Sequence, residues 1–158
     1  MVVIGFDPGS IIFGIGILKK ENNRISYLYS EEIALKERDF YAKMKILWQH
    51  LEMLYQKFPI DGAAIEEGFL GKNVKSMNVL SKVRGVVLGS LLSRGIELKS
   101  YSPRAVKLAL TCTGDASKSQ VNNVVNMLLQ LNPETKIRGA DESDALAVAF
   151  CHLLSVRC

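Results

Sequence analysis

Four acidic residues occupy positions from which their carboxylates can meet. Asp7 and Glu66 each follow directly after a short apolar run that is typical of a buried strand. If these strands are parallel neighbours, both carboxylates lie at the same C-terminal edge of the sheet, where open α/β sheets usually hold their ligands. Asp141 and Asp144 are three residues apart in the first turns of an expected helix, so they share one helix face and can join the first pair.

Taken one at a time, these acids have ordinary structural explanations. Asp7 could close a turn by bonding to its own backbone, while Asp141 and Asp144 could cap a helix and complement its dipole. The pair Glu66-Glu67 is harder to explain, because two acids at the end of the buried run Ala63-Ala64-Ile65 need water or a cation. Clustered carboxylates raise each other's pKa unless a hard cation compensates them.

Mg²⁺ suits such a cluster, since it prefers oxygen ligands and keeps bound waters that can act as nucleophiles. The sequence holds neither a GxGxxG turn nor a P-loop lysine, the usual marks of a nucleotide cofactor site. The turn Asp7-Pro8-Gly9 resembles the phosphate-holding turn of actin-like ATPases, but those enzymes need a second domain and a far longer chain. The four acids therefore favour metal-dependent phosphodiester hydrolysis.

The elements that must hold these acids begin with three consecutive strands. They are Val2 to Phe6, Ile12 to Lys19 and a third in which Ile25, Tyr27 and Tyr29 alternate with other residues. Asn22-Asn23 is a hairpin-type turn before the third strand, and we expect the three strands to be antiparallel. Gly14 and Gly16 in the second strand indicate close backbone approach or a bulge.

Helices and two further strands follow. The amphipathic helix Asp39 to Phe58 precedes a strand from Ile60 to Glu66, an order that favours a right-handed parallel crossover. The next expected element is the helix Asn73 to Arg94, in which Gly85 and Gly89 allow close backbone approach. After it we expect the strand Ile96 to Tyr101, the helix Pro103 to Leu110, a helix capped by Ser117 or Ser119, and a last helix from Ala140 to about Val156. The sequence thus predicts a single α/β domain over residues 1–158, with a mixed five-stranded sheet of three antiparallel and then parallel strands, flanked by helices.

Basic residues are concentrated between Gly71 and Lys118. This segment carries nine Lys or Arg side chains against only Glu97 and Asp115, a net charge of +7, so the rest of the chain carries −3 of the total +4. Such a distribution indicates a polyanionic partner and a clustered electrostatic footprint. A solvated lysine-rich surface is the alternative explanation.

The composition argues against several classes of protein. The apolar stretches are far shorter than the ~20 residues that span a bilayer, and the chain does not open with a secretory signal pattern, so we expect a cytoplasmic protein without membrane contact. Cys112, Cys151 and Cys158 contain no CxxC pair, which argues against a disulfide framework or a zinc site. We expect Cys151 to be a packing residue, and His50 and His152 to be partly buried helix residues.

With its acids and elements in this order, the chain resembles the RuvC family of Holliday junction resolvases, which has a ribonuclease H-like fold. The resemblance covers nearly the whole chain. Four motifs carry it: Ile4 to Ser10 with the Gly14-x-Gly16 strand, Ala64 to Asn73 with Arg84-Gly85-Val86, Val106-Lys107 with Lys118 to Val121, and Ala140 to Ala147.

The resemblance implies that the four acids are catalytic and bind two Mg²⁺ ions on either side of the scissile phosphate, with Mn²⁺ able to substitute. These acids are Asp7, Glu66, Asp141 and Asp144. It implies paired incision of two strands of like polarity in four-way branched DNA, during recombination and repair. The helix after Glu66 is the family's dimer interface, so a homodimer is expected, and a branch-migration motor is a further candidate partner. Apolar residues expected at the dimer face are Leu80, Val83, Val87, Leu88 and Leu91, and packing of this helix in the protein's own core is the competing explanation.

The resemblance also implies a set of DNA-binding residues. Lys107 and Lys118 match family lysines near the scissile strand. Phe69 matches an aromatic residue that engages unpaired bases at the crossover, and the alternative is a buried Phe69 that closes the end of the sheet. The full set is Phe69, Lys72, Asn73, Lys75, Arg84, Arg104, Lys107 and Lys118. Glu67 departs from the family pattern, because relatives often have a non-acidic residue after the catalytic glutamate. The choice of Glu66 over Glu67 rests on strand alternation and motif alignment.

Two other functions are weighed against junction resolution. A nuclease of the same fold could act on structured RNA, and a junction-binding protein could have lost catalysis. The segments Phe69 to Asn73 and Lys118 to Gln120 resemble RuvC more closely than the RNA-cleaving branch. The presence of all four acids argues against lost catalysis.

Overall fold

The computed structural model describes residues 1–22, 24–37, 39–67 and 74–156, without the side chains of residues 74 and 75, and contains a five-stranded mixed sheet. The strands are β1 (Val2–Asp7), β2 (Ile12–Glu21), β3 (Arg24–Ala34), β4 (Gly62–Glu66) and β5 (Leu98–Tyr101). Their order is β3-β2-β1-β4-β5, in which β1 to β3 are antiparallel and β4 is parallel to both β1 and β5. The predicted mixed sheet is thus confirmed.

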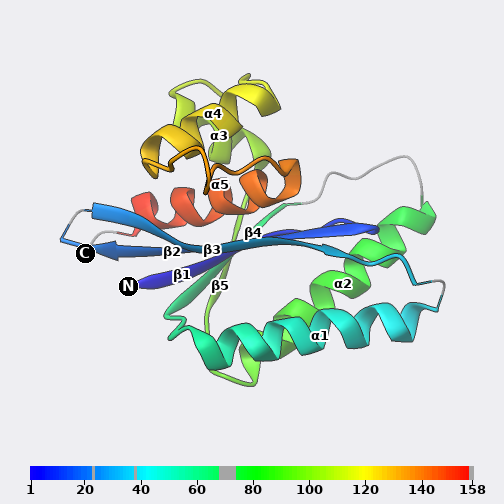
Figure 1. Cartoon of the computed structure of the whole chain (residues 1–158). Coiled ribbons are helices and arrows are strands. Elements are labelled where there is room, and N and C mark those ends of the chain that lie inside the picture. The colour runs from blue at the N-terminus through cyan, green and yellow to red at the C-terminus, as the bar shows by residue number, and fades with distance from the viewer. Residues whose placement is uncertain (23, 38, 68–73, 157–158) are drawn as a thin grey trace.

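Helices cover both faces of this sheet. Those in the described part of the chain are α1 (Phe40–Lys57), α2 (Val74–Leu92), α3 (Pro103–Thr111), α4 (Lys118–Leu128) and α5 (Ala140–Ser155). Figure 1 shows α1 and α2 on one face and α5 on the other, with α3 and α4 outside α5. No helix among the described residues is long and apolar enough to cross a membrane.

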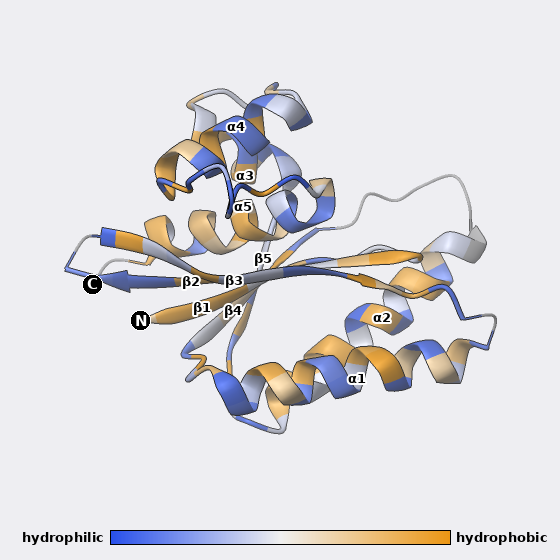
Figure 2. Ribbon diagram, in the orientation of Figure 1, coloured by the Kyte–Doolittle hydropathy of each residue, from blue (hydrophilic) through white to orange (hydrophobic). Residues whose placement is uncertain are grey.

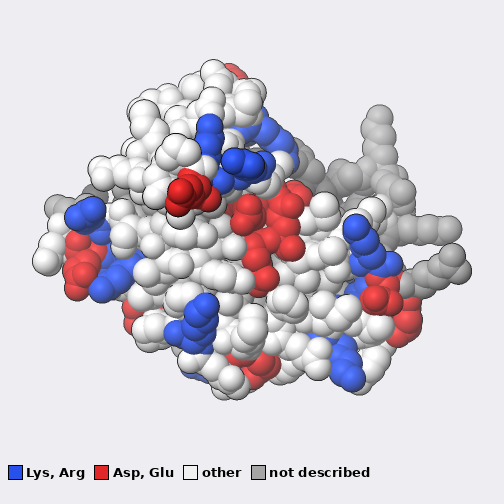
Figure 3. Space-filling model, viewed as in Figure 1, with Lys and Arg blue, Asp and Glu red and all other residues white. Residues whose placement is uncertain are grey.

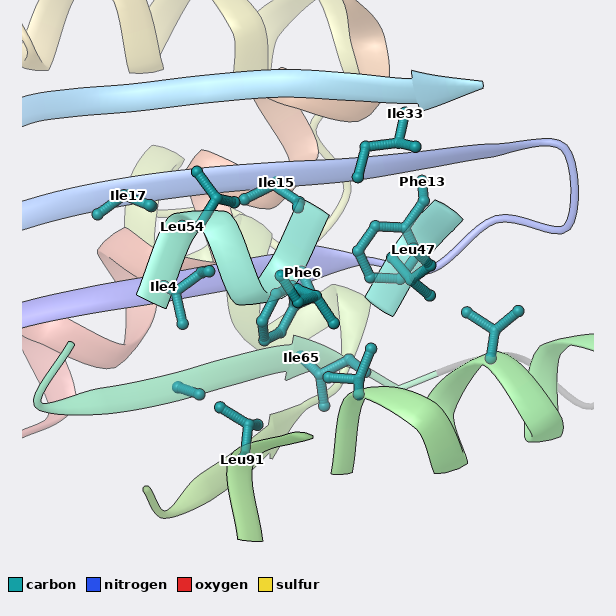
Figure 4. Packing of buried hydrophobic residues seen from close by; sticks show 14 of the residues in the cluster. Ile4, Phe6, Phe13, Ile15, Ile17, Ile33, Leu47, Leu54, Ile65 and Leu91 are labelled. Carbon is teal, nitrogen blue, oxygen red and sulfur yellow. The ribbon is translucent and has the colours of Figure 1, made fainter. Parts of the chain in front are cut away.

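The two faces of the sheet have separate apolar cores. Phe6, Ile65 and Leu47 are buried in the core between the sheet and the helices α1 and α2 (Figure 4). The second core joins the other face to α3, α4 and α5, and Figure 2 shows β1 apolar along most of its length between these layers. Because side chains alternate along a strand, Asp7 and Glu66, which follow Phe6 and Ile65, are on the α5 side.

Three glycines let α5 pack directly on the backbone of the sheet. A methyl group on Gly5 would lie 2.2 Å from the Ala145 carbonyl oxygen, and one on Gly14 would lie 2.1 Å from the Asp141 carbonyl oxygen. Gly16 has a similar contact of 2.7 Å with a backbone nitrogen of α5. These positions therefore exclude any side chain, and the close approach predicted for Gly14 and Gly16 is confirmed.

Some element boundaries differ from those expected. Strands β4 and β5 begin two residues later than expected, because Ile60 and Ile96 are half-buried loop residues that pack against the core. The helix α2 ends at Leu92 and is followed by a turn in which Gly95 has a φ of 67°. Ser117, and not Ser119, caps α4, where its side chain and that of Gln120 form a reciprocal capping box.

Gly85 and Gly89 have open space around them. A methyl group on either would meet nothing within 4 Å among the described residues, and both glycines are exposed. The close backbone approach expected here is therefore wrong for contacts among the described residues.

Cys151, His50 and His152 have structural surroundings, as predicted. Cys151 and His152 are buried in α5, and Nδ1 of His152 lies 2.8 Å from the hydroxyl of Tyr101. His50 is half-buried on α1, where Nδ1 lies 3.4 Å from the Glu31 carboxylate. These contacts tie helices to the sheet.

Candidate active site

Asp7 and Glu66 lie next to each other at one edge of the sheet. The parallel pairing of β1 and β4 ends at Phe6 and Ile65, so the next residue of each strand is an acid. Both acids line one cavity of about 230 Å³, together with residues of α3, α4 and α5. The lining residues are Asp7, Glu66, Pro103, Val106, Lys107, Lys118, Val121 and Asp144.

The helix α5 brings the other two acids to this edge. Its N-cap residue, Gly139, has no side chain that could cap the helix. Instead, Oε1 of Glu32 on β3 accepts hydrogen bonds from the backbone amides of Asp141, at 3.1 Å, and Glu142, at 3.4 Å. A strand residue therefore caps the helix that carries the second pair of acids.

The acids of the site belong to a larger acidic region. Figure 3 shows acidic side chains grouped in the middle of one face, where β3 passes the N-terminal end of α5. Within this region the Ser30 hydroxyl donates a hydrogen bond of 3.0 Å to the Glu142 carboxylate. The contact joins β3 to α5 next to the Glu32 cap.

The four carboxylates are close enough to perturb one another. Burial, with a further contribution from the charges of the other three acids, raises the pKa of Asp7 from 3.8 to about 7. The pKa of Glu66 is raised by burial and by Asp144, and that of Asp141 is raised by burial and by Glu32. The side chain of Asp7 counteracts part of the rise in the pKa of Asp141, so these two side chains interact directly. The structure thus brings all four predicted acids together, and without a cation Asp7 retains its proton up to about pH 7.

Two lysines border the cavity. Nζ of Lys118 donates a hydrogen bond of 2.7 Å to Oδ2 of Asp144, and this bond raises the pKa of the lysine. Lys107 on α3 lines the same cavity, where its charge counteracts the rise in the pKa of Glu66. Three of the acids and the two lysines therefore line the same cavity.

Arg84 reaches the cluster from the other side of the sheet. Its Nη2 atom, on α2, donates a hydrogen bond to the backbone carbonyl oxygen of Glu66. The side chain is half-buried, and burial lowers its pKa. This intramolecular contact differs from the DNA contact expected for Arg84.

The structure also separates Glu66 from its neighbour Glu67. Glu66 lines the cavity, whereas Glu67 is exposed and its charge acts on Arg84. The backbone amide of Glu67 donates to the Tyr101 carbonyl at 2.8 Å, which extends the pairing with β5. Strand alternation therefore places Glu66 in the cavity.

The donor set of the cluster fits a hard divalent cation. All four side chains offer carboxylate oxygens, the ligands that Mg²⁺ prefers, and burial together with the charges of the other three acids raises the pKa of Asp7 in spite of the nearby Lys118. Among the described residues, no three Asp, Glu, His or Cys side chains already converge as a metal site. A cation held by all four carboxylates would require these side chains to rotate toward it.

Comparison with known proteins identifies the family. The family model named crossover junction endodeoxyribonuclease RuvC matches residues 3–152. The chain belongs to this family. RuvC of Christiangramia forsetii is 38% identical over 152 residues, which cover 96% of this chain and 78% of the relative. RuvC of Ruminiclostridium cellulolyticum is 37% identical over 153 residues, which cover 96% of this chain and 91% of the relative.

Solved structures of RuvC have the same fold. Thermus thermophilus RuvC matches with a TM-score of 0.85 and 26% identity, over 97% of this chain and 93% of that one. The same protein in complex with a Holliday junction substrate matches with a TM-score of 0.86 and 24% identity, over the same shares of both chains. The ribonuclease H-like fold expected from the resemblance to this family is confirmed.

The residues predicted to bind DNA fall in different places. Lys107 and Lys118 border the cavity of the site. Arg104 is exposed on α3, where its side chain lies against Gly114. Outside the described residues are the side chain of Lys75 and the whole of Phe69, Lys72 and Asn73. Their DNA contacts stay predictions.

Glu32 is a site residue that the sequence analysis missed. Its contact with α5 depends on two segments that are 109 residues apart in the chain. One signal was available, because Gly139 offers no acceptor at the helix N-cap and the free amides need one from elsewhere. That signal does not indicate which residue supplies it.

Proposed function

We propose that this protein is a structure-selective endonuclease that resolves four-way DNA junctions, in recombination and repair, by cutting two strands of like polarity. The observation that carries the proposal is the cavity in which acids of β1, β4 and α5 face Lys107 and Lys118. Carboxylates that can hold cations, next to lysines that attract phosphate, suit phosphodiester cleavage. Membership of the RuvC family supports this function, since the family is named for crossover junction endodeoxyribonuclease and one solved member is in complex with a Holliday junction substrate.

The cofactor that we propose is Mg²⁺, with two ions per site and Mn²⁺ as a substitute. The residues that would hold them are Asp7, Glu66, Asp141 and Asp144. Bound ions would lower the pKa of a bound water and neutralise charge on the scissile phosphate. Asp7 has to release its proton first, because carboxylates bind metal in the ionised form.

Lys118 is suited to move between the protein and the DNA. Its side chain is 70% exposed, whereas that of its partner Asp144 is only 17% exposed. A lysine ammonium binds phosphate as a point charge without a fixed orientation. When it turns to a phosphate it frees a carboxylate oxygen of Asp144 for metal, so DNA binding and metal binding support each other. Lys107 holds the phosphate from α3.

Further DNA contacts are proposed on α3 and near the start of α2. Phe69 stacks on bases that are unpaired at the crossover, a contact typically worth ~1–3 kcal/mol per base. Charged and polar residues add contacts to the phosphate backbone. They are Lys72, Asn73, Lys75 and Arg104.

We also propose a homodimer that forms through α2. Val83, Val87 and Leu91 are buried against the sheet, so these three members of the expected dimer face belong to the core. The outward side instead presents Leu88, 44% exposed, Leu92, 67% exposed, and two glycines with open space around them. A two-fold dimer across this side matches the symmetry of a four-way junction. A branch-migration motor stays a candidate partner, and the cytoplasm is the compartment proposed for this activity.

The test replaces each acid by its amide and measures junction binding and incision separately. The variants are Asp7→Asn, Glu66→Gln, Asp141→Asn and Asp144→Asn. Each is expected to abolish incision of a synthetic four-way junction and to leave binding largely intact, because the acids hold cations and repel phosphate. Equal loss of binding and incision in all four variants would show that the acids are structural.

Substrate comparison with the native protein separates the alternatives. A linear duplex and a structured RNA are assayed beside the junction, all with Mg²⁺. The junction is expected to be cut in preference to both. Preferential cleavage of the RNA, or binding without any incision, would support one of the two alternatives, which family membership does not favour.

A further inference from the structure

Arg84 connects α2 to the end of a catalytic strand. The pairing of β1 and β4 stops at Phe6 and Ile65, so the Glu66 carbonyl lies one residue beyond it. The Arg84 guanidinium donates a hydrogen bond to that carbonyl oxygen. A charged donor makes a stronger hydrogen bond than a neutral one. The end of β4 is therefore held by a helix from the other side of the sheet.

The same strand end is held from a second direction. The amide of Glu67 donates to the Tyr101 carbonyl on β5 at 2.8 Å. Arg84 binds the carbonyl and β5 binds the amide of the same peptide group, so the two contacts fix the orientation of the peptide that directly follows Glu66. A rotation of this strand end would turn the Glu66 carboxylate out of the cavity.

The surroundings of Arg84 favour this role over a contact with DNA. Its side chain is half-buried, whereas that of Lys118 is 70% exposed. The charges that act on Arg84 are those of Glu67 and Glu66. A move of the guanidinium to a phosphate would leave the Glu66 carbonyl without this donor.

We propose that Arg84 is a positioning residue, which holds the end of β4 so that the Glu66 carboxylate stays in the metal cluster. Gly85, the next residue, is exposed on the side of α2 proposed for the dimer. A partner subunit seated there would also fix the helix that carries Arg84. The inference rests on the metal site of the proposed function. Replacing a group that orients a metal ligand through a hydrogen bond typically lowers metal affinity or activity by about 10- to 100-fold.

Two substitutions test this role. Arg84→Met removes the donor and the charge but keeps most of the aliphatic length, and Arg84→Lys keeps the charge. Calorimetry measures Mn²⁺ binding to the DNA-free protein, and junction affinity is measured without metal at several salt concentrations. Arg84→Met is expected to weaken Mn²⁺ binding by about tenfold or more and to leave junction affinity and its salt dependence unchanged. Arg84→Lys is expected to recover part of the Mn²⁺ affinity.

Lys82→Met is the matched control, because it removes one positive charge from an exposed side chain of the same helix. It is expected to leave Mn²⁺ binding unchanged. Arg84→Met could instead bind Mn²⁺ normally, weaken the junction complex and lower the slope of log affinity against log salt concentration by about one. That result would mean that Arg84 contacts DNA, and it would overturn the proposal. A lower melting temperature with normal Mn²⁺ affinity would show a merely structural role and also overturn it.

The native protein distinguishes failure of this inference from failure of the proposed function. If the native protein neither binds Mn²⁺ nor cuts the junction, the proposed metal-dependent function is wrong. If the native protein does both and Arg84→Met matches it, only the positioning role of Arg84 is wrong.

Discussion

The Lys118 ammonium donates a hydrogen bond to the Asp144 carboxylate, with 2.7 Å between the two atoms. The lysine is largely exposed, whereas the aspartate is largely covered, so the lysine is the partner that can leave. In the DNA-free protein it neutralises a carboxylate that we propose as a metal ligand. Lys118 is therefore an internal counter-ion of the acidic cluster.

Lys118→Ala is expected to change metal binding and cleavage in opposite directions. Without DNA the variant should bind Mn²⁺ more tightly, because no ammonium competes for Asp144. It should cut the junction more slowly, because the phosphate loses a cation, and the salt slope of junction binding should fall by about one. Calorimetry, cleavage rates and binding at several salt concentrations measure these effects.

Lys136→Ala, at an exposed lysine before α5, is the control for Lys118→Ala. An unchanged slope and rate in Lys118→Ala would place this lysine away from the phosphate.

The metal-free protein is expected to lose stability as the pH rises from about 4 to about 7. Burial and neighbouring carboxylates raise the pKa of Asp7 to about 7, so the folded state keeps a proton that the unfolded chain has released. Stability falls with rising pH wherever the folded state binds more protons. At roughly 1.4 kcal/mol per pKa unit, Asp7 contributes at most about 4 kcal/mol. The raised pKa values of Glu66 and Asp141 act in the same direction.

Urea unfolding at pH 5 and pH 8 measures this loss. Asp7→Asn is expected to remove most of the difference between the two pH values. Saturating Mg²⁺ should stabilise the native protein at pH 8, because an ion that binds only the folded state adds to its stability. The same pH dependence in the native protein and in Asp7→Asn would contradict the raised pKa.

Glu32→Ala is expected to lower the free energy of unfolding by about 1 kcal/mol, the usual effect of losing a helix cap. The amides of Asp141 and Glu142 lose their acceptor in this variant. Cleavage should fall as well, because Asp141 is in the first turn of the released helix end. Glu32→Gln keeps an acceptor oxygen and should lose less. Chemical unfolding is compared with Glu37→Ala, another exposed glutamate. Equal stability of the two alanine variants would mean that the cap contributes nothing.

Gly14→Ala is expected to displace α5 or prevent folding. The added methyl group would lie 2.1 Å from the Asp141 carbonyl oxygen, a backbone atom that cannot move alone. Any protein that still folds should have lost cleavage. Gly62→Ala on β4 is the matched control, because the nearest atom that its methyl group would meet outside its chain neighbours is His152 Nε2 at 3.4 Å, an ordinary van der Waals contact. Thermal unfolding compares the two, and a normally folded, active Gly14→Ala would show that the helix can sit farther from the sheet.

Leu88→Glu is expected to convert the proposed dimer into a folded monomer. The leucine is 44% exposed on the outward side of α2, where a charge would be buried by a second copy of the chain. Sedimentation equilibrium at micromolar concentration measures the change, and paired incision of the junction should be lost with the dimer. Leu154→Glu, at a 51% exposed leucine of α5 on the other side of the sheet, is the control. A native monomer that resolves junctions fully would refute the dimer.

Strand alternation explains why half of the site was predictable. Asp7 and Glu66 follow apolar runs whose last residues, Phe6 and Ile65, face the core beneath α1 and α2. One assumption, that the two strands are parallel neighbours, then places both acids on the opposite face. That pairing is present, so a local pattern and a single contact were sufficient.

The spacing of Asp141 and Asp144 on one helix face predicted the second pair of acids, whereas the features that were missed depend on contacts between distant elements. Glu32 caps a helix that lies 109 residues further along the chain, and no local pattern indicates it. The hydrogen bond from the Arg84 side chain to the Glu66 carbonyl follows from how α2 packs on the sheet. Periodicity also placed Val83 and Leu91 at a dimer face, although they are core residues, because an apolar stripe has the same spacing in both settings.

The contact of α5 with Gly5, Gly14 and Gly16 has a consequence for how the site can evolve. The nearest atoms that meet there belong to the main chain, and main-chain atoms have no alternative rotamers. The gap between the two pairs of acids therefore does not depend on which apolar side chains fill either core. Substitutions in those cores can accumulate and alter stability while the spacing of the acids is inherited unchanged.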